Sequence, residues 1–83
     1  MEIQRRIAVV GLVIENREEA ANRVNDILSK YGGLIVGRMG VPYREKNISI
    51  ISLIVDGTTD DISSMTGKLG NIKGVKVRSV VTV

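Results

Sequence analysis

Two arginines and a tyrosine surround the only proline of the chain, and they are the side chains best suited to contact an anion. The segment is residues 37–44, which read GRMGVPYR. Arg38 and Arg44 can each donate paired hydrogen bonds to a carboxylate or a phosphate. Tyr43 adds an aromatic ring beside them. These residue types at this spacing indicate a binding site for a small anion.

The glycines of this segment support a second interpretation, a protected edge of a β-sheet. Glycine inside a strand often marks a bulge or a close approach by another backbone or a ligand. Under this alternative the strand is closed by a bulge and a proline, and the arginines keep the edge soluble. For any single residue of the segment, we favour this edge-strand interpretation over the anion-binding site. Gly37 and Gly40, and Gly67 inside a predicted helix, are therefore candidate positions of close approach by an interface or a ligand.

A lysine between two glycines, in residues 66–70 (TGKLG), invites comparison with a phosphate-binding loop. That motif needs a glycine five residues before the Gly-Lys pair and a hydroxyl residue directly after it. This chain has Ile62 and Leu69 at those places, so the comparison fails. The second-rank candidates for ligand binding are Thr58, Thr59 and Lys68.

The chain has few side chains that could bind a metal ion or catalyse a reaction. It has no cysteine and no histidine. This excludes thiol nucleophiles, imidazole bases and the nitrogen and sulfur ligands of zinc, iron-sulfur and nickel sites. Asp56, Asp60 and Asp61 could bind a hard cation with a threonine, but they lack the spacing of a calcium-binding loop, and helix capping accounts for them. We therefore expect no metal, no cofactor and no enzyme activity.

Charge and hydropathy define the broad class of the protein. Twelve basic and nine acidic residues give a net charge of +3, and the longest basic run is Arg5 and Arg6. Nucleic-acid-binding modules usually carry a concentrated basic stripe, so a nucleic-acid partner is not expected. No stretch reaches roughly 18 consecutive apolar residues, and the first residues lack the pattern of a secretory leader. We expect one cytoplasmic domain over residues 1–83, without a membrane segment.

Hydrophobic periodicity predicts the order strand, helix, strand, strand, helix, strand. Right-handed crossovers interleave the two halves into the split arrangement of the ferredoxin-like fold, with the first and third strands central. The expected class is α+β, a βαββαβ chain with a four-stranded antiparallel sheet and two helices on one face. The strands are expected near residues 5–14, 34–41, 48–55 and 75–83.

Both helices have start signals, and the first also has a stop signal. Asn16 with Glu19 resembles a capping box, and Gly32 and Gly33 are typical of a helix end in the left-handed conformation. Thr58 or Thr59 is expected to cap the second helix. The predicted buried stripes are Ala20, Val24, Ile27, Leu28 and Tyr31 in the first helix, and Ile62, Met65 and Leu69 in the second, with Ile72 as a further candidate.

The third predicted strand is apolar on both faces. Residues 48–55 (ISIISLIV) place only one serine on each face. Two helices cover one side of a four-stranded sheet. The simplest way to bury the other side is to pack it against a second copy of the same sheet. Burial of about eight such side chains is worth on the order of 10–20 kcal/mol, against about 4–15 kcal/mol for association. We expect a homo-oligomer, a dimer or a tetramer; the alternative is that loops or the last strand fold over this face.

Four segments resemble a small family of regulators assigned to the iron-only hydrogenase system. They read IAVVGLVIENRE, GRMGVPYRE, ISIISLIVDGTTDDI and TGKLGNIKGVKV, and together they cover nearly the whole chain. The resemblance implies an ACT-like ferredoxin fold, related to the ligand-sensing C-terminal domain of the nickel-responsive repressor. It also implies a role in hydrogenase maturation or expression, and no established ligand.

The chain departs from the better understood relatives of that family. Nickel-sensing domains use His and Cys ligands, which are absent here, so nickel sensing does not carry over. Amino-acid-binding ACT domains usually have a glycine after the first strand, where this chain has Glu15, Asn16 and Arg17. This argues against an amino-acid effector. The ferredoxin-like pattern uses all 83 residues and leaves no DNA-binding helix-turn-helix, so regulation would pass through another protein.

The residues predict a non-enzymatic regulatory or ligand-sensing domain, and the family resemblance implies that it belongs to the hydrogenase system. It would self-associate through its sheet faces and bind a small anionic effector or a protein partner. One alternative is a nucleic-acid-binding ferredoxin-like module, but the central strands carry no aromatic residue on which bases could stack. The other alternative is a structural adaptor without a ligand.

Overall fold

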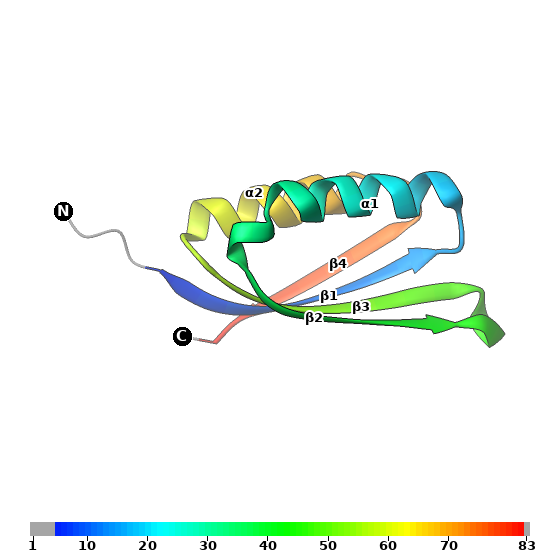
Figure 1. The fold of residues 1–83 in the computed structure, drawn as a ribbon, viewed down its shortest axis with the longest axis horizontal. Coiled ribbons are helices and arrows are strands. Elements are labelled where there is room, and N and C mark those ends of the chain that lie inside the picture. Colours follow the sequence, from blue (N-terminus) through cyan, green and yellow to red (C-terminus); the bar gives the residue numbers. More distant parts are fainter. Residues whose placement is uncertain (1–4, 83) are drawn as a thin grey trace.

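The computed structural model describes residues 5–82 as two helices packed on one side of a sheet (Figure 1). All strand pairs are antiparallel and the strand order is β2-β3-β1-β4, which confirms the predicted ferredoxin-like fold with β1 and β3 central. The predicted strand end at Val83 lies outside the described residues. The elements are β1 (Arg6–Glu15), α1 (Glu18–Lys30), η1 (Gly32–Leu34), β2 (Ile35–Tyr43), η2 (Arg44–Lys46), β3 (Ile48–Gly57), α2 (Thr59–Gly70) and β4 (Val75–Val81).

The core lies between the helices and the sheet. Along β1, Ala8, Val10 and Leu12 are fully buried while their neighbours are exposed, which is the period of two of a strand with one covered face. The helix stripes pack against this face as expected, although Ile27 and Tyr31 are only partly buried. The buried helix residues within the elements are Ala20, Val24 and Leu28 in α1, and Ile62, Met65 and Leu69 in α2.

The start of α1 differs from the prediction. Arg17 is the N-cap residue, and no side chain caps the helix. The predicted cap, Asn16, instead faces the connection between β2 and β3. Its Nδ2 donates to Asn47 Oδ1 at 2.9 Å, and its backbone N–H donates to Asn47 O at 3.1 Å. The side chain is thus used across the fold, which local spacing cannot reveal.

The end of α1 also differs from the prediction of a left-handed glycine. Tyr31 is the C-cap residue with φ of −102°, and neither Gly32 nor Gly33 has a positive φ. The Leu34 N–H donates to Tyr31 O at 2.9 Å and tightens the chain into the 3₁₀ turn η1. This turn satisfies a carbonyl of the helix end, so no left-handed residue is needed.

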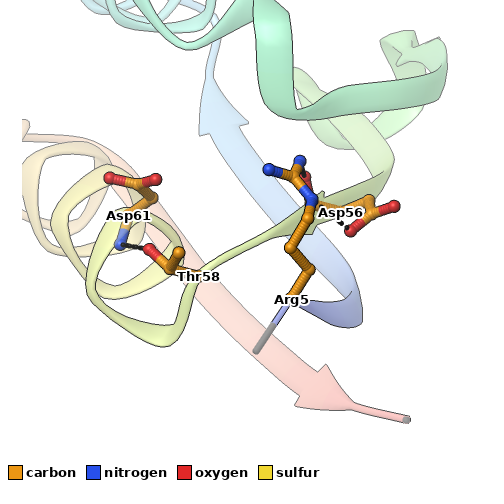
Figure 2. Close-up of polar contacts among 4 residues, drawn as sticks. All are labelled: Arg5, Asp56, Thr58 and Asp61. Carbon is orange, nitrogen blue, oxygen red and sulfur yellow. Dashed lines mark hydrogen bonds and ion pairs between the residues drawn. The ribbon is translucent and has the colours of Figure 1, made fainter. Parts of the chain in front are cut away.

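Thr58 caps α2, in agreement with the sequence. Its Oγ1 accepts a hydrogen bond from the Asp61 N–H at 3.1 Å (Figure 2). Thr58→Ala should therefore lower the free energy of unfolding by about 1 kcal/mol, as measured by urea denaturation. Thr59→Ala is the control, because Thr59 is already inside the helix. An equal loss in both variants would contradict the capping role.

Strand β2 is an edge strand interrupted by a bulge. Its pairing with β3 shifts between Ile35 and Gly37, which leaves Val36 as the extra residue. Pro42 lacks an N–H and is tolerated on an edge strand. The bulge and the proline both hinder pairing of this edge with another sheet. The edge-strand interpretation is therefore confirmed for the backbone of residues 37–43, whereas Arg44 begins the 3₁₀ turn η2.

Candidate functional site

The side of the sheet away from the helices is apolar and exposed. Val9, for example, lies between the buried Ala8 and Val10 and pairs with Ile54 on β3 and Val80 on β4. We call this surface the open face. Its large apolar side chains are 37–65% exposed and are Ile7, Val9, Val13, Met39, Val41, Tyr43, Ile50, Ile54 and Val80.

Small residues cross the middle of the open face. Gly11 on β1 pairs with Ser52 on β3, and the next row along the strands is Val9 with Ile54. The open face is therefore not flat, because a pair of large residues on the central strands lies beside a pair of small ones. A hollow of about 250 Å³ adjoins the small residues and is lined by Gly37, Arg38, Met39, Ser52 and Ile54.

The described charged residues of the open face lie at its margins. Lys76 and Arg78 lie on the edge strand β4, where Arg78 Nη1 donates to Val77 O at 2.9 Å. At the end of β3, Arg5 Nε lies 3.1 Å from Asp56 Oδ1 (Figure 2). Both partners of this ion pair are largely exposed, so it contributes little to stability.

A polar groove opens on the helix side, where the turn between β1 and α1 meets the turn between β2 and β3. Two adjoining hollows of about 190 and 270 Å³ share Asn16 and Ser49. Ile14, Val24 and Ile51 give the first hollow an apolar floor. We call the combined site the polar groove, and its polar wall residues are Glu15, Asn16, Arg17, Asn25, Arg44, Asn47 and Ser49.

Asn47 shapes the polar groove. Its φ of 56° lies in the left-handed region, which asparagine tolerates better than most residues. Its hydrogen bonds with Asn16 hold the β2–β3 turn against the start of α1. Arg17 Nε lies 3.2 Å from Glu15 Oε2, whereas the Arg44 guanidinium has no ion-pair or hydrogen-bond partner within residues 5–82. Arg44 is therefore the cation of the groove that is available to an anion.

The structure separates the three first-rank candidates of the sequence. Arg44 lines the polar groove, while Tyr43 lies on the open face opposite Ile48. Arg38 lies in the middle of β2 opposite the buried Leu53, a register position on the helix side of the sheet, although the residue also borders the hollow of the open face. A strand rises about 3.3 Å per residue, so the Cα atoms of Arg38 and Arg44 are about 20 Å apart. The two arginines do not form one fork around a small anion.

The second-rank candidates lie away from the polar groove. Thr58 is engaged as the cap of α2, and Thr59 follows it, at the end of β3 opposite to the groove. Lys68 Nζ lies 5.2 Å from the centre of the Tyr31 ring, a distance typical of a cation–π contact. Tyr31 Oη lies 2.8 Å from Ser64 Oγ. Thr58 and Lys68 therefore have structural roles, and their ligand roles stay predictions.

The contact between Lys68 and Tyr31 has a measurable consequence. The Lys68 ammonium, followed by the Ser64 hydroxyl, holds the pKa of Tyr31 below its ordinary value. Lys68→Met should therefore raise this pKa, which a titration followed by tyrosinate absorbance measures. The depressed pKa of Tyr31 favours the folded state above the ordinary pKa of tyrosine, and this stabilisation is lost as the pH falls through the folded pKa. Lys73→Met is the control, and an equal shift there would contradict the pairing.

No contact within the described chain requires glycine at the three predicted close-approach positions. A Cβ added at Gly37 or Gly67 would meet no heavy atom within 4 Å, and one at Gly40 would meet Ile51 Cγ1 at an ordinary 3.9 Å. Close approach at these positions stays a prediction about a ligand or a second chain.

Several groove residues were not singled out from the sequence. Asn25 and Ser49 gave no signal, because polar residues on a helix or near a strand end are common. Asn47 gave a weak one, since asparagine directly before a strand is typical of a left-handed turn residue. Asn16 was noticed, but as a helix cap.

Two kinds of site are absent from the described residues. Among residues 5–82, no three acidic side chains come together in a way that could hold a metal ion. No helix in the same part of the chain is long and apolar enough to span a membrane.

Comparison with solved structures defines the class as an ACT-like domain. The ACT domain from GTP pyrophosphokinase of Chlorobium tepidum has a TM-score of 0.78 at 20% identity, covering 93% of this chain and 100% of that chain. The regulatory subunit of aspartate kinase from Thermus flavus has a TM-score of 0.56 at 18% identity, covering 94% of this chain and 57% of that chain. At these identities the similarity shows the fold alone.

Closer similarity defines the family. Residues 6–79 match the TM1266-like family, described as "Iron-only hydrogenase system regulator, putative". The uncharacterized protein TM1266 from Thermotoga maritima is 38% identical, with a TM-score of 0.95, and the match covers 96% of this chain and 100% of that chain. No curated protein matches. The chain belongs to the TM1266-like family, as the resemblance predicted.

Proposed function

We propose that this chain is a cytoplasmic, non-enzymatic regulatory domain of the iron-only hydrogenase system that works as a homo-oligomer. The open faces of two copies pack together, and the assembly responds to a small anionic effector and acts on a protein partner of that system. The observation that carries the proposal is the uncovered apolar face of the sheet. The regulator family and the ACT-like fold support the regulatory role.

The size of the open face suits a second copy. Four strands about 4.8 Å apart and about nine residues long, each rising about 3.3 Å, form a platform on the order of 500 Å². Two such platforms bury about 1,000 Å² in total, which is near the lower limit for a specific interface. The pairing is therefore expected to be specific and reversible, as a regulated assembly requires.

A nucleic acid suits the open face poorly. Lys76 and Arg78 are its basic residues on β4, and they lie at one margin. The one aromatic residue, Tyr43, lies on the edge strand β2. Binding of single strands needs a basic groove that follows the backbone and aromatic rings on which bases stack. The apolar side chains in the middle of the open face would form no favourable contacts with phosphate groups.

The polar groove is where we place the small anionic effector. Arg44 supplies an available guanidinium, the asparagines supply amide donors, and the apolar floor suits the rest of a small ligand. The groove also adjoins the open face through one strand end. Pro42 and Arg44 line the groove, and Tyr43 between them lies on the open face. An anion on Arg44 would therefore act on a segment that also contributes to the interface.

Native mass spectrometry of the purified protein tests the proposal, because it reports copy number and retained ligand together. We expect two or four copies and, with added small carboxylates and phosphates, a bound anion. Arg44→Ala should lose the anion and keep the copy number, while Arg23→Ala, an exposed arginine outside the groove, should change neither. A single copy would contradict self-association. Several copies that bind no anion would support the structural adaptor instead.

A further inference from the structure

The open face has raised and hollowed parts, and their arrangement limits how a second copy can dock on it. Cross-strand pairing arranges the exposed side chains in rows that run across the sheet. Two neighbouring rows lie near its middle. One row is Gly37, Ile54, Val9 and Val80, and the next is Met39, Ser52, Gly11 and Arg78.

Two copies stacked face to face can be related by a two-fold axis along the strands or by one across them. An axis along the strands through the middle of the sheet places β1 of each copy over β3 of the other. Gly11 then faces Ser52 of the second copy, and this happens twice. Small residues opposite small residues leave a void at the centre of the interface, and well-packed interfaces avoid such voids.

An axis across the strands, between the two rows, places each strand over its own counterpart. The first row of one copy then faces the second row of the other. Val9 faces Gly11 of the second copy, and Ile54 faces Ser52 of the second copy. In both of these contacts a large side chain meets a small one. The two-fold symmetry makes each contact occur twice, with the roles of the two copies exchanged.

The same register extends to both edges of the sheet. On β2, Met39 faces Gly37 of the second copy, where the hollow of about 250 Å³ can receive its flexible side chain. On β4, Val80 lies against the aliphatic stem of Arg78 of the second copy, whose guanidinium reaches water at the margin.

We propose that a second copy of this chain docks on the open face through a two-fold axis that crosses the strands between Val9 and Gly11. The large central pair of each copy, Val9 and Ile54, then fills the space over the small central pair, Gly11 and Ser52, of the other. This inference rests on the proposed function and specifies the geometry of the same pairing. This pairing also explains why Gly11 and Gly37 are glycines. Contacts within their own chain do not, since no heavy atom of it lies within 4 Å of an added Cβ.

Gly11→Val tests the register. No heavy atom of the single chain lies within 4 Å of an added Cβ, but the valine side chain collides with Val9 of the second copy. The dissociation constant of self-association should therefore rise at least about tenfold, as measured by sedimentation velocity. The double variant Val9→Ala with Gly11→Val exchanges large and small and should recover most of the loss. Gly33→Val, in the exposed turn η1, is the control. With an axis along the strands, Gly11→Val would fill a void, so unchanged or tighter association would overturn the proposal.

Isotope-filtered NMR on dimers of labelled and unlabelled wild-type chains tests the register without any substitution. We expect contacts between the Val9 methyls of one copy and the Gly11 Hα of the other. Contacts between Val9 and Ile54 of different copies would overturn the register and leave the proposed function standing. A wild-type protein that stays a single copy would overturn both.

Discussion

Ile54→Lys should abolish self-association and leave the chain folded. Ile54 is 47% exposed in the middle of the open face, where it pairs with Val9 and Gly37. Docking of a second copy would bury an ammonium group without a partner, and symmetry would bury it twice. An unpaired buried charge is among the most costly changes to an interface. We expect the dissociation constant to rise at least about a hundredfold, as measured by sedimentation velocity over a range of concentrations.

Val81→Lys is the matched control for this substitution. Val81 is 49% exposed, but it pairs with Ala8 and so belongs to the helix side of the sheet. The control adds the same charge at nearly the same exposure and should leave the dissociation constant unchanged. Circular dichroism checks that both variants are folded. If Ile54→Lys sediments like the wild type, the open face is not the interface.

Leu53→Ala, made in the Ile54→Lys background, should strongly destabilise the single chain. Leu53 is 0% exposed and belongs to the core cluster with Met65 and Leu69. Truncation of a buried leucine costs about 2–5 kcal/mol, a large part of the roughly 5–15 kcal/mol of a typical domain. The background keeps the chain monomeric, so that concentration-dependent stabilisation by pairing does not enter the urea unfolding curve.

Ile50→Ala in the same background is the control for the core. Ile50 alternates onto the open face of β3 and is partly exposed. Its truncation should cost less than about 1 kcal/mol, because little apolar area leaves the protein interior. Similar losses for Leu53→Ala and Ile50→Ala would contradict a core on one side of the sheet.

The fold could be predicted from the sequence because its apolar residues repeat clearly, with the period of a helix in two segments and the period of a strand in four. In β1 the alternation of Val10 and Leu12 with Val9 and Val13 is apolar on both sides, which predicted that both faces of the sheet would be covered. Sequence alone did not tell which side the helices would cover. The tight connections and the right-handed crossover rule supplied the topology.

The polar groove could not be predicted, because it depends on contacts between distant segments. Asn16 and Asn47 are 31 positions apart and meet through a side-chain hydrogen bond. The separation of Arg38 from Arg44 was missed for a different reason. The second strand was expected to end near residue 41, whereas β2 continues to Tyr43. An extended strand of this length holds the two arginines about 20 Å apart, so they form two separate places and not one site.

The copy number of the unmodified chain in solution tests the central claim most directly. Sedimentation equilibrium over a dilution series into the micromolar range gives the mass of the assembly without assumptions about its shape. A mass of two or four copies that falls on dilution is the predicted result. A mass of one copy at every concentration would contradict an account in which the open face is covered by a second chain.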